Sequence, residues 1–337
     1  MNEQAFSLTG IVTLALRLVV GWTYFSAFLR RVVLENKLIP DAPGYIGEKF
    51  NHFLPNSIGI KPIIEHLVSN PTQLWWAMVI FTLIEGIVGL FFMLGFFTRL
   101  MSIGVLMLAA GILLGSGWLG TTCLDEWQIG ILGVAAGFTI FLAGGGTFSL
   151  DHVLLPKLSF LQNQHWLVWF TSGPLSISMK ALNGVAVLGA VVIFVLSLYT
   201  NQAFHNGVWG PLHNKSVKPI VEISDAKLDN NQLTFTVYRV EGADVYGSFL
   251  IGITLKDSNG HPVLDKQAED LARFPENRIR NQYIAKVKPG KHSMVIPLGA
   301  KAELTLDDAA LAQLPQGTYT LVLTDITGTT WEQAITK

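Results

Sequence analysis

A lone cysteine marks the first place where this sequence could carry out covalent chemistry. Cys123 is the only cysteine among 337 residues, and it lies in the polar turn Gly-Thr-Thr-Cys-Leu-Asp-Glu-Trp (120–127). A thiolate is a nucleophile, and nearby cations lower its pKa, whereas the adjacent Asp125 and Glu126 raise it. A single cysteine is also a common inert apolar residue. The residues leave a catalytic and an inert Cys123 open, and they exclude an intramolecular disulfide.

Two charged residues, Arg17 and Glu85, lie deep inside apolar stretches. An ionisable group at that depth of a bilayer is costly unless it faces other protein and finds a partner. Counted from helix ends that share a face, Arg17 lies about nine residues in and Glu85 about twelve, which is similar depth for antiparallel neighbours. We therefore expect the two to meet. Such a pair would either fix helix packing or serve a proton or redox-ligand site within the membrane.

Arg30 and Arg31 end the first apolar stretch. A guanidinium group offers paired donors that match a small oxyanion. Arginines at the end of a membrane helix also commonly snorkel toward water. The residues alone favour snorkelling by a narrow margin, and an anion site stays open.

Several classes of cofactor site have no support in the sequence. No GxGxxG dinucleotide fingerprint follows a predicted strand, and the motifs Walker A, CxxC, CxxCH and HExxH are absent, so no flavin, haem, iron–sulfur or zinc-hydrolase site is expected. His205 and His213 lie in one linker, but no third ligand for a metal is evident. We expect that linker to dock the C-terminal domain onto the membrane part instead. Net charge is near zero in both halves, so nothing indicates nucleic-acid binding.

The elements that must position these residues follow from an uneven distribution of charge. Residues 1–199 contain 18 charged side chains, whereas the shorter segment 200–337 contains 29. This contrast indicates one part in the lipid bilayer and one in water. We predict a transmembrane domain of four helices at 1–180, with a folded loop at 30–73, followed by a fifth transmembrane helix at 181–200. The expected apolar spans are 8–29, 74–97, 100–119, 128–142 and 181–199, and 147–180 is expected to be interfacial.

From residue 201 onward the apolar pattern changes to short alternating runs separated by turn signals. About seven or eight short strands in this length predict an all-β immunoglobulin-like sandwich at 201–337, with a β-barrel as the alternative. The expected strands are 220–223, 233–240, 248–255, 283–287, 293–296, 318–323 and 331–335.

The orientation in the membrane is not settled by charge. Five spans place the two termini on opposite faces, and a simple count of basic residues does not favour the N-terminus inside. Whichever face is inside, Arg30, Arg31, Cys123 and the β domain are expected to share one face.

Longer stretches carry a family resemblance. The hairpin Gly-Leu-Phe-Phe-Met-Leu-Gly-Phe-Phe-Thr-Arg-Leu-Met-Ser (89–102) and the turn 120–127 resemble the DoxD part of the DoxX/DoxD membrane family. That resemblance extends over 1–180. The part from 181, with one helix, a β domain, Trp209 and the run Asn-Lys-Ser (214–216), resembles DoxA. The chain thus looks like a DoxDA fusion over nearly its whole length.

The resemblance implies a thiosulfate:quinone oxidoreductase of the cell membrane. Two thiosulfates would be joined to tetrathionate, and two electrons would pass to a membrane quinone. The quinone is the one cofactor expected, without metal, flavin or haem. The resemblance also implies that the DoxA-like domain is extracytoplasmic, or periplasmic, and hence that the N-terminus is cytoplasmic. Whether the protein forms a homo-oligomer is left open by the resemblance.

The candidate site residues follow from these two lines of reasoning. Cys123 would hold one thiosulfate covalently, or electrons would pass directly to the quinone and leave Cys123 a bystander. A non-catalytic membrane anchor or assembly partner of a sulfur-oxidising complex is one alternative, and a sulfur-anion transporter is another, less favoured without inverted repeats. The expected residues are Cys123, Glu85, Asp125 and Glu126 for catalysis, Arg30, Arg31 and Trp127 for substrate, and Arg17, Glu85, Trp22 and Tyr24 for quinone.

Overall fold

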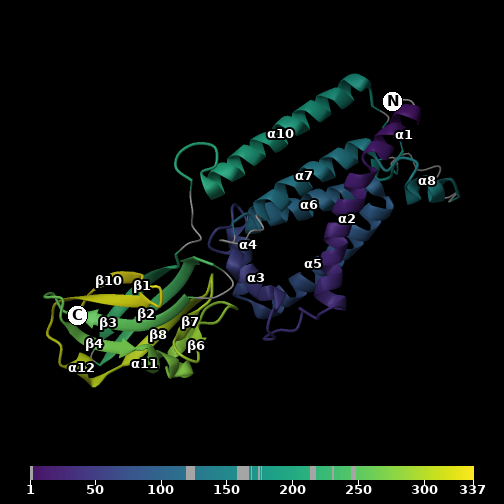
Figure 1. The fold of residues 1–337 in the computed structure, drawn as a ribbon. Helices are drawn as coiled ribbons and strands as arrows, with labels where there is room; N and C mark the ends of the chain where they lie inside the picture. Colours follow the sequence, from purple (N-terminus) through teal and green to yellow (C-terminus); the bar gives the residue numbers. More distant parts are fainter. Residues whose placement is uncertain are drawn as a thin grey trace. The chain divides into compact units, whose positions relative to one another are not determined.

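The chain forms two compact units in a computed structural model (Figure 1). One unit comprises Met1–Tyr45, Trp75–Gly117 and Asp125–His213, and the other comprises Ile46–Leu74, Trp118–Leu124 and Asn214–Lys337. The structure describes residues 3–118, 126–157, 167, 169–173, 175, 177–212, 218–229, 231–243 and 248–337.

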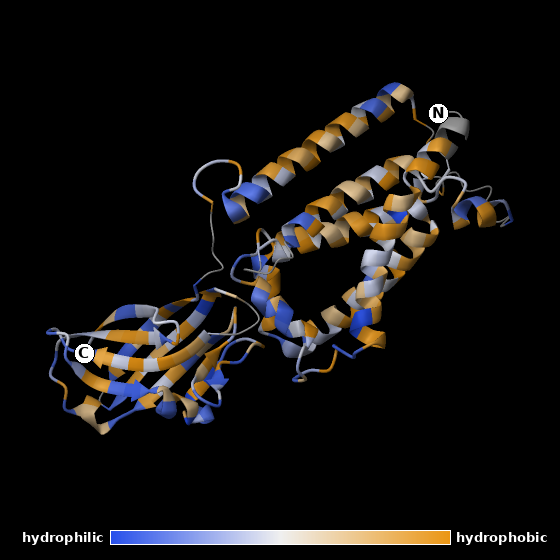
Figure 2. Cartoon of the chain, viewed as in Figure 1, coloured by the Kyte–Doolittle hydropathy of each residue, from blue (hydrophilic) through white to orange (hydrophobic). Residues whose placement is uncertain are grey.

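The first unit is helical and fits a multi-pass membrane protein. In the described ranges, four helices are long and apolar enough to cross a membrane, namely α5 (Pro71–Leu94), α6 (Thr98–Ser116), α7 (Glu126–Ala143) and α10 (Met179–His205). Figure 2 shows apolar residues along almost all of α10, with hydrophilic residues at its ends. This confirms the predicted helical membrane region. The remaining elements of the unit are α1 (Glu3–Val12), α2 (Leu14–Phe28), the π-helix η1 (Leu29–Val33), α8 (Leu150–Leu154) and the 3-10 helix η2 (Leu155–Lys157).

The predicted first span consists of two consecutive helices rather than one. Thr13 separates α1 from α2, and its hydroxyl donates to the Thr9 carbonyl at 2.7 Å. Such a side-chain bond to the preceding turn commonly bends a helix. Nearby, a Cβ on Gly10 would lie 2.3 Å from the Cα of Gly146. The bend therefore lies where the first span touches the backbone of another segment.

Glycines bring α2 and α5 into direct backbone contact. A Cβ on Gly89 would lie 2.4 Å from the Phe25 nitrogen, so no larger residue fits there without a shift. Close approach through small residues is the usual way in which membrane helices pack. The residue numbers of each facing pair add to 114, which defines an antiparallel register. The pairs are Gly21 with Met93, Phe25 with Gly89, and Phe28 with Gly86.

Helix α10 packs along α7 through few contacts. A Cβ on Gly189 would lie 2.1 Å from the Phe138 ring. Near the other end of α10, the Trp127 indole nitrogen donates to the Thr200 hydroxyl at 2.8 Å. Most of the apolar side chains of α10 are exposed and thus available to lipid.

The second unit contains the all-β domain, as predicted. In the part of this domain that the structure describes, one antiparallel sheet has the strand order β1-β2-β8-β5. The other has the order β10-β9-β3-β7-β6, and β4 pairs with β3. Alternating apolar residues of both sheets, among them Phe235 and Ile253, form one core. The strands are β1 (Ile220–Asp229), β2 (Gln232–Glu241), β3 (Ser248–Lys256), β4 (Pro262–Gln267), β5 (Ile279–Asn281), β6 (Lys288–Pro289), β7 (Met294–Ile296), β8 (Lys301–Asp307), β9 (Thr318–Asp325) and β10 (Thr330–Thr336), with short helices α11 (Ala268–Ala272), η4 (Glu276–Arg278) and α12 (Ala309–Ala312).

One predicted strand is wrong, and one central strand was missed. Residues 283–287 form bends and coil instead of a strand. Their apolar residues Tyr283 and Ile284 pack against helices of the segment 46–74, so their pattern reflects that contact rather than a sheet. The missed strand β8 lies between β2 and β5. It alternates Ala302, Leu304 and Leu306 inward with polar residues outward, which a closer reading of its period would have detected.

Part of the loop predicted at 30–73 completes the β domain. It contains α3 (Ile46–Phe53) and α4 (Lys61–Val68), which place Leu54, Ile64 and Val68 in a cluster with Tyr283 and Ile284. This segment therefore belongs to the same compact unit as the sandwich.

Asn51 joins the backbones of the two parts of this unit. Its fully buried side chain donates to the Gly299 carbonyl at 2.5 Å and accepts from the Ala285 nitrogen at 3.2 Å. Gly299 has φ +73°, and a Cβ there would lie 2.0 Å from the Asn51 carbonyl oxygen. Glycine is thus required at 299 both by the backbone conformation and by this close contact.

Candidate functional site

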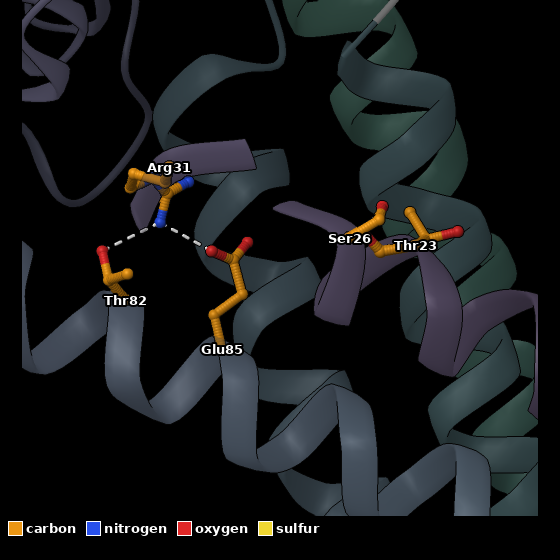
Figure 3. A network of polar contacts seen from close by, with 5 residues as sticks. All are labelled: Thr23, Ser26, Arg31, Thr82 and Glu85. Carbon is orange, nitrogen blue, oxygen red and sulfur yellow. Dashed lines mark hydrogen bonds and ion pairs between the residues drawn. The ribbon is translucent and has the colours of Figure 1, made fainter. Parts of the chain in front are cut away.

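An ion pair joins Arg31, near the end of the first span, to Glu85 in the middle part of α5 (Figure 3). The Arg31 Nη1 atom donates to Glu85 Oε2 at 2.6 Å and to the Thr82 hydroxyl at 3.1 Å. The guanidinium also lies 5.6 Å from the centre of the Phe81 ring. The two charged side chains are 13% and 5% exposed. In such a shielded site the attraction of opposite charges is far stronger than in water.

The local backbone explains why the two adjacent arginines differ. They lie in the π-helix η1, where the Leu34 nitrogen bonds to the Leu29 carbonyl at 2.9 Å. π-Helical turns are rare in proteins, but those that occur often lie at functional sites. Arg31 points toward α5, whereas Arg30 is exposed and donates to the Ser26 hydroxyl at 3.1 Å. Arg30 is therefore the more accessible cation, and Arg31 is held by Glu85.

Tyr24 lies on the inner side of this ion pair. It is 4% exposed and packs in the cluster that contains Val88 and Phe92, on the face of α5 that also carries Glu85. Glu85 interacts electrostatically with Tyr24 and with Arg30. A carboxylate, a phenol and two cations thus form one polar group within otherwise apolar helices.

The expected contact between Arg17 and Glu85 is wrong. The α2–α5 register places Glu85 level with Leu29 and Arg17 level with Phe97. Twelve residues along α5 separate these levels, which corresponds to about 18 Å in an α-helix. The predicted contact was wrong because the first span begins well beyond the C-terminal end of α5. Equal counts of residues from the two span ends therefore do not correspond to equal depth.

Arg17 instead belongs to a second polar network, at the opposite end. It is 2% exposed, and its guanidinium donates to the Gly145 carbonyl at 2.7 Å and to the Phe148 carbonyl. Arg99 is fully buried and donates to the carbonyls of Phe141 and Thr171. Both arginines are thus bound mainly by main-chain oxygens.

Asp151 supplies the negative charge of this second network. Its carboxylate accepts from the nitrogens of Phe97 and Thr98 at 2.7 and 3.0 Å, and from the Thr98 and Ser172 hydroxyls at 2.9 and 2.8 Å. It also interacts electrostatically with Arg17 and Arg99. Most acceptor positions of Asp151 are therefore occupied. From its place on α8, Asp151 links the start of α6 to Ser172, which follows α8 in the chain.

The other predicted site residues fall in different places. Trp127 is half-buried and bonds to Thr200, so its indole nitrogen is engaged in helix packing. Glu126 is half-buried at the start of α7. Trp22 is 52% exposed on α2 and does not join the Glu85 group. Cys123 and Asp125 lie outside the described residues.

Sequence reasoning missed Thr82, Arg99 and Asp151. Thr82 was detectable because it lies three residues before Glu85, which places both on one face of a helix. Arg99 and Asp151 lie outside the predicted apolar spans, Arg99 between two of them and Asp151 in the segment expected to be interfacial, so neither was expected to be buried. Within the described ranges, no group of three or more His, Cys, Asp or Glu side chains could hold a metal ion.

The arrangement supports two kinds of chemistry. A shielded carboxylate such as Glu85 can hold or release a proton within the membrane. An exposed guanidinium such as Arg30, with a second cation beside it, can bind a small oxyanion.

Two known protein families match successive parts of the chain. Residues 12–179 match the family described as TQO small subunit DoxD, and residues 204–334 match the family described as TQO small subunit DoxA. TQO stands for thiosulfate:quinone oxidoreductase. Because the two families cover successive parts of one polypeptide, the chain belongs to both of them and is a DoxDA fusion.

Proposed function

We propose that this protein is a membrane-bound thiosulfate:quinone oxidoreductase in its own right. The observation that carries the proposal is the presence of a DoxD part and a DoxA part in one chain, both named for that activity. The Arg31–Glu85 group supports it, because it combines cations with a proton-holding carboxylate inside the membrane unit.

The reaction balances as a two-electron exchange. Two thiosulfate dianions lose two electrons and form one central S–S bond, which yields tetrathionate. One quinone takes up these electrons together with two protons and becomes a quinol. The protein must therefore bind a dianion near water, bind a quinone from lipid, and deliver protons to it.

The described residues divide these tasks. Arg30 is the cation that attracts thiosulfate, because it is exposed and its hydrogen-bond donors are only partly used. Arg31 is a positioning residue, since its Nη1 atom holds Glu85 and Thr82. Glu85 passes protons toward the quinone. These roles retain Arg30, Arg31 and Glu85 from the sequence analysis, and they assign Arg17 to structure.

Cys123 offers a covalent route for joining the two sulfur atoms. Its thiolate and the terminal sulfur of one thiosulfate form an S–S bond while two electrons pass to the quinone. The second thiosulfate then attacks that terminal sulfur, so that tetrathionate forms and the Cys123 thiolate leaves. In the direct route, the quinone oxidises the two thiosulfates without this adduct. Cys123→Ala separates the routes, because only the covalent route loses turnover while quinone binding is kept.

The proposed orientation follows the same logic. The DoxA-like domain is extracytoplasmic and the N-terminus is cytoplasmic, so the Arg30 end of the helices meets external thiosulfate. Single cysteines at the exposed positions Lys61 and Lys180 check it, as Lys61→Cys and Lys180→Cys in a Cys123→Ala background. In intact cells, a membrane-impermeant maleimide should label the first variant and not the second. The reverse pattern would invert the orientation.

The direct test uses the purified full-length chain in liposomes that contain a short-chain quinone. We expect thiosulfate to produce quinol and tetrathionate in equal molar amounts, and we expect no product when thiosulfate or quinone is omitted. Absence of turnover from folded, quinone-loaded protein would remove the proposal.

A non-catalytic role has one observation in its favour, because both matched families are described as small subunits. In that case the chain would anchor another sulfur-oxidising protein. Turnover would then require a co-purifying partner and would be unchanged by Arg30→Ala and Glu85→Gln.

A further inference from the structure

A groove opens between α2 and α7 on the side of the helical unit. It has a volume of about 420 Å³, and its walls include Leu16, Val20, Leu132 and Ala135. Leu132 is 68% exposed and Leu16 is 38% exposed at its rim. An apolar rim on membrane helices faces lipid, so the groove is entered from the bilayer rather than from water.

The buried part of the groove contains a polar group with an unused hydrogen bond. Tyr24 lines the groove and is 96% buried, since its exposed fraction is 4%. Among the described residues, its hydroxyl has no hydrogen-bond partner. The Tyr24 hydroxyl is not among the fully enclosed polar atoms that lack a partner, so it keeps some exposure, and a ligand in the groove can accept its hydrogen bond.

Because Gly133 has no side chain, the Tyr24 hydroxyl has room next to α7 at the groove. A Cβ on Gly133 would lie 2.9 Å from the Tyr24 oxygen and 2.7 Å from the Ala109 Cβ. The glycine thus leaves room where α7 passes Tyr24. The neighbouring hydroxyls of Thr23 and Thr139 donate to the carbonyls of their own helices. These two hydroxyls can therefore accept a hydrogen bond from a ligand but cannot donate one.

The depth of this hydroxyl indicates the kind of ligand. Gly133 is seven residues from the start of α7 and ten from its end, which places it roughly 10–15 Å from either end. The ester carbonyls of phospholipids lie at the bilayer surface, about 15 Å from its centre. An acceptor that reaches Tyr24 from lipid must therefore be carried into the apolar interior on an apolar molecule, and a quinone carbonyl meets this condition.

The groove also connects to the proton-holding group. Glu85 interacts electrostatically with Tyr24, and Tyr24 packs on the α5 face that carries Glu85. Glu85 is therefore the carboxylate near a molecule bound against Tyr24, and it can serve as the proton source for that molecule.

We propose that the α2–α7 groove is the quinone site, with the Tyr24 hydroxyl donating a hydrogen bond to one quinone carbonyl. This inference rests on the proposed function for the identity of the ligand, and it adds the location and the binding group. Glu85, which interacts electrostatically with Tyr24, supplies protons for reduction of the quinone, and Arg31 holds Glu85 in place.

A photoreactive quinone locates the site without any need for turnover. The full-length chain in liposomes is irradiated with an azido-substituted benzoquinone that carries a short isoprenoid tail. We expect labelled peptides from Leu14–Phe28 and Glu126–Ala143, and we expect unlabelled quinone to compete. Labelling elsewhere, or labelling here that excess phospholipid but not quinone removes, overturns the proposal. Cross-links at the groove to a second copy of the chain also overturn it.

Two variants test the binding group. Tyr24→Phe removes only the hydroxyl and should weaken binding of the quinone about tenfold, as expected for one hydrogen bond in a shielded site. Ala135→Phe fills the groove and should abolish competed labelling. Ala190→Phe makes the same change on the exposed surface of α10 and should leave labelling unaltered. Equal labelling in Ala135→Phe and Ala190→Phe contradicts the site.

The two proposals fail in different ways. If the groove binds quinone but thiosulfate yields no tetrathionate, the function is wrong and the site stands. If turnover is normal while the quinone labels other helices, the function stands and the site is wrong.

Discussion

The helical unit contains two shielded arginines at different levels, Arg17 and Arg31, and they are satisfied in different ways. Arg17 donates to the carbonyls of Gly145 and Phe148 and lies near an Asp151 that is already held by four donors. Arg31 donates to a single carboxylate and a hydroxyl, and its partner Glu85 lies beside Tyr24. One arginine is bound by main chain, and the other by a group that can change its protonation.

This difference indicates which end does chemistry. Main-chain carbonyls cannot titrate, and the Asp151 carboxylate is held by four donors, so the network of Arg17, Arg99 and Asp151 serves mainly to hold segments together. A carboxylate with a single ionic partner can take up or release a proton when that partner or a ligand moves. Burial of a charge alone is therefore a weak sign of function, and the nature of its partners is a stronger one.

The largest expected effect is the loss of stability in Asp151→Ala. The change leaves the Phe97 and Thr98 nitrogens and the Ser172 hydroxyl without their acceptor, beside buried cations. We expect a loss of about 3–5 kcal/mol, as for breaking a buried ion pair. The midpoint of thermal unfolding in detergent measures it, with Asp151→Asn as the milder control. A stable variant with defective thiosulfate turnover would move the chemistry to this end.

Glu85→Gln should have the opposite profile. The amide oxygen still accepts from Arg31 while the ionic attraction is lost, so we expect a smaller loss of stability than in Asp151→Ala. Turnover with thiosulfate and quinone should fall about 100-fold, because a positioned proton-transfer group typically contributes at least that factor. A variant that unfolds early, with activity lost only in proportion to folded protein, would make Glu85 a structural residue like Arg17.

Arg30→Ala tests the exposed cation. We expect about a tenfold rise in the KM for thiosulfate, about 1.4 kcal/mol, with kcat nearly unchanged and with a weaker dependence on salt. Arg30→Lys should recover part of the effect, since charge is kept and the paired donors are lost. A KM equal to that of the parent in both variants would place thiosulfate away from Arg30.

The smallest effect concerns Trp127, which was expected to bind substrate. Trp127→Phe and Thr200→Val remove the two sides of one hydrogen bond between α7 and α10. Each should cost about 1 kcal/mol of stability and leave the KM for thiosulfate unchanged. A rise in KM in Trp127→Phe alone would restore the substrate role.

Much of the fold was predictable, and the partners of the site residues were not. The apolar length of α5, α6, α7 and α10 and the alternation of β2, β3 and β9 are local signals, which a single sequence carries. Glu85 was identified because a lone acid in an apolar span is rare. Its partner was misassigned because contacts through Gly21, Gly86 and Gly89 set the register of α2 on α5, and composition says little about such contacts. The same holds for residues 283–287, whose apolar side chains face helices that precede them by over 200 residues.

The contact between Asn51 and Gly299 has a consequence for synthesis of the chain. The two residues are 248 positions apart. At ribosomal rates of roughly 5–20 residues per second, Gly299 is added about 12 to 50 s after Asn51. Throughout that interval Leu54, Ile64 and Val68 lack their partners Tyr283 and Ile284. The segment 46–74 must therefore emerge early and wait with its apolar side chains uncovered, which makes it the natural place for a chaperone to act before the last strands arrive.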